Sequence, residues 1–232
     1  LVLVLRICRR DFIEGTLEFK IFSDADFGGD RVQRKSTDGG AAVLVGVHGT
    51  RVFIDGDSNL SKTTAGSTGN AEASAAARTA KKFLPFIELI EWLLGCSLSV
   101  KFLIDSTALL SAIKTGYSGK MRYVKKHSGV SFSLLHDLIG RISEYVPSES
   151  NFSDIFTKAV NENAMVWCRR YGGLEDAATL SGTWCECYCG GSPASAFGRS
   201  SRCLRRVATG GTKCEMCTAT CRCDCWGALR RV

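Results

Sequence analysis

Apolar and polar side chains alternate along residues 16–24, which is the pattern of a half-buried β-strand. This predicted strand ends at Asp24. Glycines interrupt the pattern at 28–29, and the apolar segment 39–47 then predicts a second strand that returns beside the first. A third predicted strand at 50–54 would complete an antiparallel meander.

Residues 71–94 repeat apolar side chains at helical spacing and predict a long helix. Pro85 removes one backbone hydrogen bond from this helix, so it should kink the helix or split it in two. At about 100° per residue, Glu72 falls on the same stripe as Phe83 and Ile90. Because burying an unpaired charge is costly, Glu72 either lies at a solvated helix start or faces a cation.

Short strands and helices alternate in the chain that follows. Asp105 comes directly after one of these strands, and Asp154 lies in the first turn of the last helix, where the helix dipole favours an anion. A strand, a helix and a strand in this order predict an α/β fold with a mixed sheet. The pattern predicts a polar loop at 55–70, strands at 100–104 and 142–146, and helices at 107–114, 130–139 and 153–160.

Four acidic residues therefore lie at the ends of predicted elements: Asp24, Glu72, Asp105 and Asp154. Mg²⁺ prefers oxygen ligands in octahedral geometry, and two such ions about 4 Å apart can stabilise both the attacking and the leaving oxygen in phosphoryl chemistry. The four residues are thus candidate ligands of a two-metal site. The alternative is that they are polar strand ends and first-turn residues that the helix dipole favours.

The composition limits the class of protein. With 232 residues, 45% of them hydrophobic, the chain is long enough for one sizeable core and an extension. The apolar run at residues 1–5 is far shorter than the roughly 20 residues that span a bilayer, and we find no pattern of a signal peptide. We therefore expect an intracellular protein, in the cytoplasm or the nucleus, that does not bind membranes.

A net charge of +7 is compatible with nucleic-acid binding. The predicted loop at 117–126 interleaves basic residues with Tyr117 and Tyr123, a combination that suits phosphates and stacked bases, although it would also suit a solvated loop. His127 follows this loop and is a candidate proton carrier or product-release group, the alternative being a surface histidine. The candidate nucleic-acid-binding residues are Lys120, Arg122, Lys125 and Lys126.

The distribution of cysteine indicates a boundary near Thr183. Three of the twelve cysteines precede this residue, and the other nine lie between Cys185 and Cys225. The pair Cys214-x-x-Cys217 has the spacing of half a zinc site, but the tail contains neither a second pair at that spacing nor a histidine. We therefore expect no zinc there, and interpret the tail as a poorly ordered extension or as translated sequence of a decayed element, the alternative being a zinc-binding module.

Seven short motifs follow one another along the chain: Ser23–Asp30, Arg34–Thr37, Ser67–Glu72, Ile104–Ser106, Lys126–His127, Tyr145–Pro147 and Asp154–Lys158. In this order and at this spacing they resemble the ribonuclease H domain of copia-type LTR retrotransposon polyproteins, which are related to retroviruses. The resemblance extends over roughly residues 15–175. It divides the chain into an N-terminal fragment at 1–14, a ribonuclease H-like domain at 15–175 and the cysteine-rich tail at 176–232.

This resemblance implies a ribonuclease H-like α/β fold, a five-stranded mixed sheet flanked by helices, that here carries the cysteine-rich C-terminal extension. It implies an endonuclease that cuts the RNA strand of RNA–DNA hybrids, with reverse transcriptase and integrase regions of the same polyprotein as partners. It also implies that two Mg²⁺ or Mn²⁺ ions are held by the four acidic residues, Asp24, Glu72, Asp105 and Asp154.

Two positions and one short stretch depart from the family pattern. Phe27 stands where a tryptophan is usual, Ala73 where an aromatic residue is usual, and the stretch 130–133 lacks the usual Arg-Tyr-His. An alternative hypothesis is therefore a catalytically inactive retrotransposon remnant that keeps the fold and binds nucleic acid.

Overall fold

The computed structural model of this chain divides into two compact units, Leu3–Leu174 and Leu1–Val2 with Glu175–Val232, which are described separately. The residues that it describes are 2–3, 7–30, 32, 34–61, 64–119, 121, 124, 129–175, 184–189 and 201–206.

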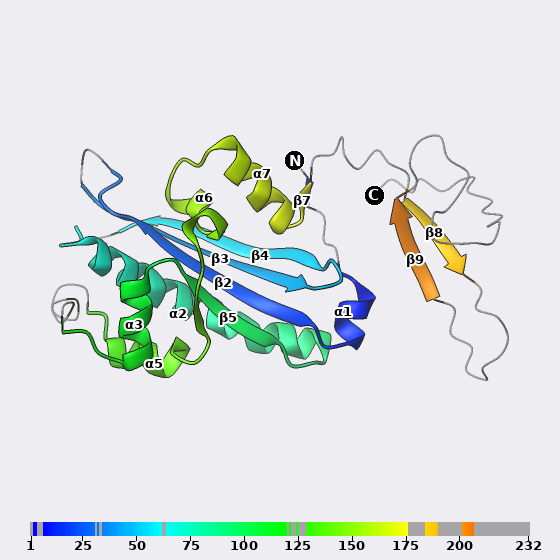
Figure 1. The fold of residues 1–232 in the computed structure, drawn as a ribbon, viewed down its shortest axis with the longest axis horizontal. Coiled ribbons are helices and arrows are strands. Elements are labelled where there is room, and N and C mark those ends of the chain that lie inside the picture. The colour runs from blue at the N-terminus through cyan, green and yellow to red at the C-terminus, as the bar shows by residue number, and fades with distance from the viewer. Residues whose placement is uncertain are drawn as a thin grey trace. The chain divides into compact units, whose positions relative to one another are not determined.

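Five strands of the larger unit form a single sheet: β2 (Leu17–Asp26), β3 (Thr37–Gly46), β4 (Arg51–Leu60), β5 (Ser99–Ile104) and β6 (Ser143–Tyr145). The strand order is β4-β3-β2-β5-β6 (Figure 1). Strands β2, β3 and β4 form the antiparallel meander, and β5 and β6 run parallel to β2. This topology confirms the five-stranded mixed sheet that the ribonuclease H-like fold class predicts.

Helices cover both faces of the sheet (Figure 1). One face carries α2 (Thr68–Leu94), α3 (Thr107–Thr115) and α5 (Phe132–Ile139), and the other carries α6 (Asp154–Thr157) and α7 (Glu162–Tyr171). The remaining short elements are α1 (Arg9–Ile13), the 3-10 turn η1 (Ser148–Ser150), and β1 (Val2–Leu3), which pairs with β7 (Leu174–Glu175).

Each face of the sheet has its own hydrophobic core. Phe19 and Ile21 of β2 are buried on the α2 side with Phe83, whereas Phe22 is buried on the α7 side with Phe152. Because successive side chains of a strand point to opposite faces, the even-numbered residues at the end of β2 face α6 and α7.

The helix predicted at 71–94 is α2, and Pro85 does not split it. The Ser67 side chain accepts a hydrogen bond from the backbone N–H of Asn70 at its start, and Gly95 ends it at φ 66°. Pro85 and Lys81, whose carbonyl loses its helical partner, are both exposed. Water can therefore hydrate that carbonyl, and the helix continues through the proline.

The prediction of a loop at 55–70 is wrong for its first six residues, which extend β4 to Leu60. Their polar side chains are stabilised by α2, since Lys82 Nζ lies 2.8 Å from Asp55 Oδ2 and Arg78 forms an ion pair with Asp57. These partners are more than twenty residues away in the sequence, so the local pattern could not reveal them.

The helix predicted at 153–160 is shorter than expected, and a further helix was not predicted. Lys158 has extended backbone angles and ends α6 after one turn. The unpredicted helix α7 begins after Asn161, whose side chain accepts a hydrogen bond from the backbone N–H of Ala164. This capping residue, followed by an acidic first turn, is the signal that could have identified α7.

In the smaller unit, β8 (Trp184–Cys189) pairs with β9 (Ser201–Arg206) in an antiparallel arrangement. The tail at 176–232, which we expected to be poorly ordered, otherwise lies outside the described residues, and so do Cys214 and Cys217. Among the helices that the structure describes, none has the length and apolar character of a membrane span.

Candidate metal centre

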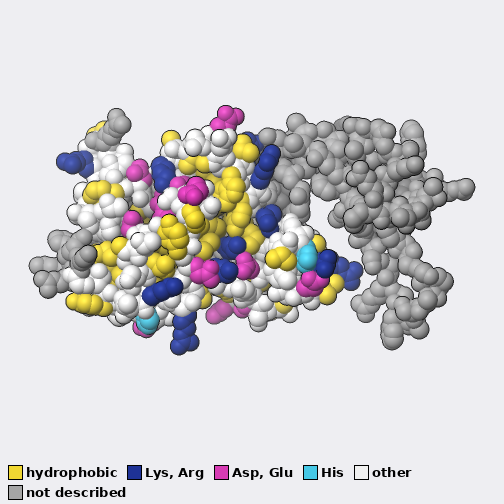
Figure 2. All heavy atoms as spheres, viewed as in Figure 1, with side chains coloured by type: hydrophobic (Ala, Val, Ile, Leu, Met, Phe, Trp, Pro, Cys, Tyr) yellow, Lys and Arg dark blue, Asp and Glu magenta, His cyan; other side chains and the backbone are white. Residues whose placement is uncertain are grey.

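Three of the predicted carboxylates converge at one edge of the sheet. Asp24 lies near the end of β2, Asp105 follows β5, and Asp154 begins α6; one oxygen of each lies within 4.8 Å of the others. Because Ser23 pairs with Ile104 on the parallel neighbour strand, the next residue of each strand reaches the same edge. Acidic side chains are visible at the surface over α6 (Figure 2).

Hydrogen bonds seat α6 against the end of β2. The Asn151 side-chain amide donates to the Ser23 carbonyl at 3.4 Å, and the Ser153 hydroxyl donates to Asn151 Oδ1 at 2.7 Å. The Thr157 hydroxyl donates to Asp24 Oδ2. The segment that begins α6 is therefore fixed to the strand that carries Asp24.

The centre is strongly negative. Burial, together with the charges of Asp24 and Asp105, raises the pKa of the Asp154 carboxyl to about 6, against the opposing effect of Lys158. Lys158 Nζ lies 2.9 Å from Asp154 Oδ2 and 3.7 Å from Asp24 Oδ2. One exposed ammonium thus faces three carboxylates.

Glu72 lies close to the centre but outside the group of three. Burial raises the pKa of its carboxyl, the charges of Asp105 and Asp24 raise it further, and a hydrogen bond with Ser106 opposes the shift. Glu72 is half-buried in the first turns of α2, and its oxygens are not among those that lie within 4.8 Å of one another. The structure therefore places Glu72 close enough to the three aspartates for the charges of Asp105 and Asp24 to raise the pKa of its carboxyl.

The donor set fits a divalent cation. Asp154 Oδ1 is buried and has no hydrogen-bond partner among the described residues, which is costly unless a positive group compensates it. The Ser148 hydroxyl donates to Asp105 Oδ2 at 3.0 Å, so this ligand is also oriented. Carboxylate oxygens are the ligands that Mg²⁺ and Mn²⁺ prefer.

The sequence motif at 154–158 contains two residues for which we predicted no role. Thr157 and Lys158 both contact Asp24, and Lys158 also contacts Asp154. Residues three and four positions apart lie on the same side of a helix, so their spacing from Asp154 was the available signal.

The basic residues of the predicted loop at 117–126 and the candidate proton carrier lie outside the described residues. These are Lys120, Arg122, Lys125, Lys126 and His127.

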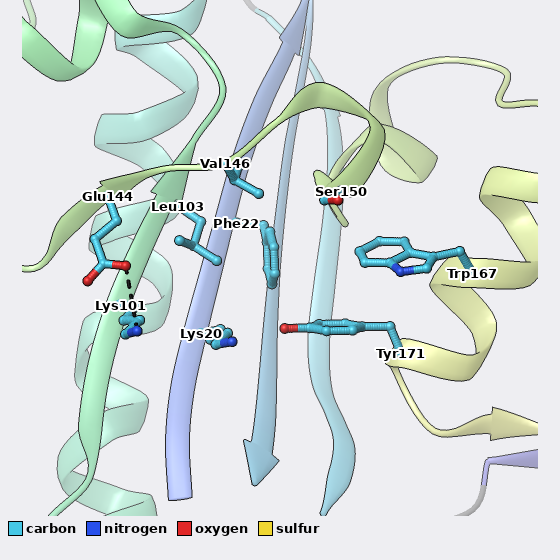
Figure 3. Close-up of a pocket in the computed structure, with 9 residues that line it drawn as sticks. All are labelled: Lys20, Phe22, Lys101, Leu103, Glu144, Val146, Ser150, Trp167 and Tyr171. Carbon is cyan, nitrogen blue, oxygen red and sulfur yellow. Dashed lines mark ion pairs between the residues drawn. The ribbon is translucent and has the colours of Figure 1, made fainter. Parts of the chain in front are cut away.

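A cavity of about 310 Å³ lies on the α7 side of the sheet. Its floor includes Phe22 and Leu103, which precede Asp24 and Asp105 by two residues and so share their face of the sheet (Figure 3). Trp167 and Tyr171 of α7 form one wall, with stacked rings whose centroids are 4.9 Å apart. We did not predict this cavity because we did not predict α7.

Two lysines line the same cavity, and both are ion-paired. Lys101 Nζ lies 3.1 Å from Glu18 Oε1 and 3.6 Å from Glu144 Oε2, the pair marked in Figure 3. Lys20 Nζ lies 3.1 Å from Glu18 Oε2. Because these charges are neutralised within the protein, the cavity is less suited to an anion than its lysines suggest.

No family model and no curated protein sequence matches the chain. Among solved structures it is similar to LC11-RNase H1, isolated from compost by a metagenomic approach, at 17% identity and a TM-score of 0.43, over 60% of this chain and 92% of that one. The same enzyme in complex with an RNA/DNA hybrid matches at 17% identity and a TM-score of 0.43, over 63% and 99% of the two chains. RNase H1 from Halobacterium salinarum NRC-1 matches at 12% identity and 0.42, over 60% and 94%. All these TM-scores are below 0.5, so the function proposed below depends on the chain's own residues.

Proposed function

We propose that this chain is a metal-dependent endonuclease that hydrolyses the RNA strand of RNA–DNA hybrids. The observation that carries the proposal is the convergence of Asp24, Asp105 and Asp154 within 4.8 Å. Asp105 follows Asp24 by 81 positions in the sequence, and Asp154 follows Asp105 by 49. All three come from motifs that resemble those of copia-type ribonuclease H domains. Neither an apolar core nor a helix dipole requires three buried or half-buried carboxylates at one point.

The three aspartates would hold one or two Mg²⁺ or Mn²⁺ ions, with Glu72 beside them. When bound, such ions supply charge stabilisation for phosphoryl transfer and lower the pKa of water. The protein's own contribution is the fixed geometry, since Asp24 is held by Thr157 and Asp105 by Ser148. The unpartnered Asp154 Oδ1 offers a further ligand atom.

Positive charge on the turn that follows β2 supports a nucleic-acid substrate. The turn between β2 and β3 follows Asp26 directly and carries Arg34, which is exposed, and the half-buried Lys35. Arg34 has a positive φ of 53°, a backbone conformation that residues other than glycine adopt at a cost in free energy. A phosphate backbone that reaches the carboxylates would pass this turn.

The proposal includes the biological setting that the motifs indicate. The chain would act inside the cell as part of a retrotransposon polyprotein, beside reverse transcriptase and integrase regions. Its substrate would be the hybrid that forms when RNA is copied into DNA.

Cleavage of defined substrates tests the proposed function. The purified chain is incubated with an end-labelled RNA–DNA hybrid, double-stranded DNA and double-stranded RNA, each with Mg²⁺ or Mn²⁺. We expect cleavage of the RNA strand of the hybrid alone, and its loss in Asp24→Asn. The function is wrong if the wild type does not cut the hybrid or if the variant cuts equally well.

Hybrid binding, measured beside cleavage on the same substrates, distinguishes the inactive remnant. Hybrid binding that weakens steeply with salt, without cleavage even in Mn²⁺, would select that alternative. Ala73, which replaces an aromatic residue of the family pattern, is fully buried in the α2-side core. The substitution is therefore accommodated by packing.

A further inference from the structure

One oxygen of Asp24 is committed to contacts at the end of α6. The side chain of Asp24 is 6% exposed, and its Oδ2 accepts the Thr157 hydroxyl hydrogen and lies 3.7 Å from Lys158 Nζ. A carboxylate with one oxygen held by a hydrogen bond has restricted rotation about its Cβ–Cγ bond. The direction of the other oxygen therefore depends on Thr157.

Thr157 is itself confined by the strand next to Asp24. Gly39 is the residue of β3 that pairs with Asp24, and a Cβ added at Gly39 would lie 2.4 Å from Thr157 Cγ2. The Ser153 carbonyl oxygen and Phe156 Cβ would lie at 3.1 Å and 3.3 Å from that Cβ. The absence of a side chain at Gly39 thus makes the space in which α6 approaches Asp24.

Thr157 also joins two of the three carboxylate-bearing elements. Its hydroxyl lies 3.3 Å from the Asp154 carbonyl oxygen, within the single turn of α6, while it donates to the Asp24 side chain. Thr157 is 8% exposed, so water does not readily replace it as a donor. The position of Asp24 is consequently coupled to the position of Asp154.

We propose that Thr157 is a positioning residue that orients Asp24 for divalent-cation binding, and that Gly39 provides the space it requires. The inference rests on the metal site of the proposed function. Hydrogen-bond partners of metal ligands fix the ligand orientation, and their loss typically costs about 10–100-fold in metal affinity. A residue that only stabilised α6 would change the melting temperature and leave the affinity of a folded protein unchanged.

The test compares Mn²⁺ affinities of the full chain, measured by electron paramagnetic resonance of the free ion. Thr157→Val, which keeps the shape but removes the hydroxyl, should weaken Mn²⁺ binding by about tenfold or more, whereas Thr157→Ser should bind within about threefold of the wild type. Thr115→Val is the matched control, since the Thr115 hydroxyl donates to backbone carbonyls at the end of α3. This control should leave the affinity unchanged.

A second comparison does not depend on the valine variant being folded. Gly39→Ala should weaken Mn²⁺ binding by pushing Thr157 from Asp24, and adding Thr157→Ser, which removes the colliding Cγ2 but keeps the hydroxyl, should recover part of it.

Equal Mn²⁺ affinity of folded Thr157→Val and the wild type would overturn the inference and leave the proposed function standing. If the valine variant does not fold, a Gly39→Ala affinity equal to that of the wild type would overturn it. Absence of Mn²⁺ binding by the wild type would overturn both the inference and the proposed function.

Discussion

Lys158 Nζ lies 2.9 Å from Asp154 Oδ2, one helical turn along the chain, and so places an ammonium beside the carboxylate cluster. A divalent ion at this cluster would have to share it with that ammonium or displace it. The side chain of Lys158 is 41% exposed, so its ion pair is screened by water and contributes at most about 1 kcal/mol to stability.

Lys158→Met should therefore raise the Mn²⁺ affinity, by about threefold, because a competing charge is removed. It should also lower the free energy of unfolding of the metal-free protein slightly. Isothermal titration and urea unfolding measure the two effects, with Lys114→Met, on an exposed position of α3, as the control. A fall in affinity would show that the ammonium helps to hold the ion.

Glu72 and Asp105 should differ in their effects on metal binding. Asp105→Asn removes a member of the close group and should weaken Mn²⁺ binding by more than about tenfold. Glu72→Gln, at a residue outside that group, should change the affinity by less than about threefold. The reverse order would mean that the ion lies nearer to α2 than the three aspartates indicate.

Arg34 should contribute to hybrid affinity without affecting the metal. Arg34→Ala should weaken hybrid binding and reduce the slope of log affinity against log salt by about 1, as expected for one lost phosphate contact. Arg141→Ala is a suitable control, since this exposed residue precedes β6 and lies at the opposite end of that strand from the cluster. Equal salt slopes for the two variants would contradict a phosphate contact at Arg34.

Acid stability should depend on Asp11, which is fully buried in α1. Burial opposes its ionisation, but hydrogen bonds from His48, Thr50 and Thr16 outweigh this effect and lower the pKa of Asp11 to about 2. Because the folded pKa is below the unfolded value of about 3.9, the ionised carboxylate stabilises the fold above about pH 4. This contribution is lost as the pH falls toward 2.

Asp11→Asn should accordingly lower the free energy of unfolding at pH 7 by about 2–4 kcal/mol and flatten its decline between about pH 4 and pH 2. Urea unfolding across this pH range gives both quantities. If the wild type and the variant lost stability in parallel on acidification, Asp11 would not be the group responsible.

The sheet was predictable because its strands carry local information. The alternation at 16–24 identified β2, and the apolar run at 100–104 identified β5, so the convergence of Asp24 and Asp105 followed once the two strands paired. The second half of β4 was not predictable, since Asp55 and Asp57 owe their positions to partners on α2.

The candidate site shows the same division between local and distant information. Asp154 was identified by its place at a helix start, and the spacing of four residues indicates its contact with Lys158, but the link from Thr157 to Asp24 depends on how α6 packs on the sheet. The position of Glu72 outside the close group likewise depends on the packing of α2 on the sheet. Neither the hydrophobic period nor the spacing of residues in the sequence predicts the Thr157–Asp24 contact or the position of Glu72.

The central claim, that three aspartates form a divalent-cation centre, is tested most directly by anomalous diffraction from crystals of the full chain grown with Mn²⁺. We predict a manganese peak within coordination distance, about 2.2 Å, of oxygens of Asp24, Asp105 and Asp154, and no such peak in crystals of Asp105→Asn. A well-ordered wild-type structure with no manganese at these carboxylates, at Mn²⁺ concentrations that saturate known sites of this kind, would contradict the account.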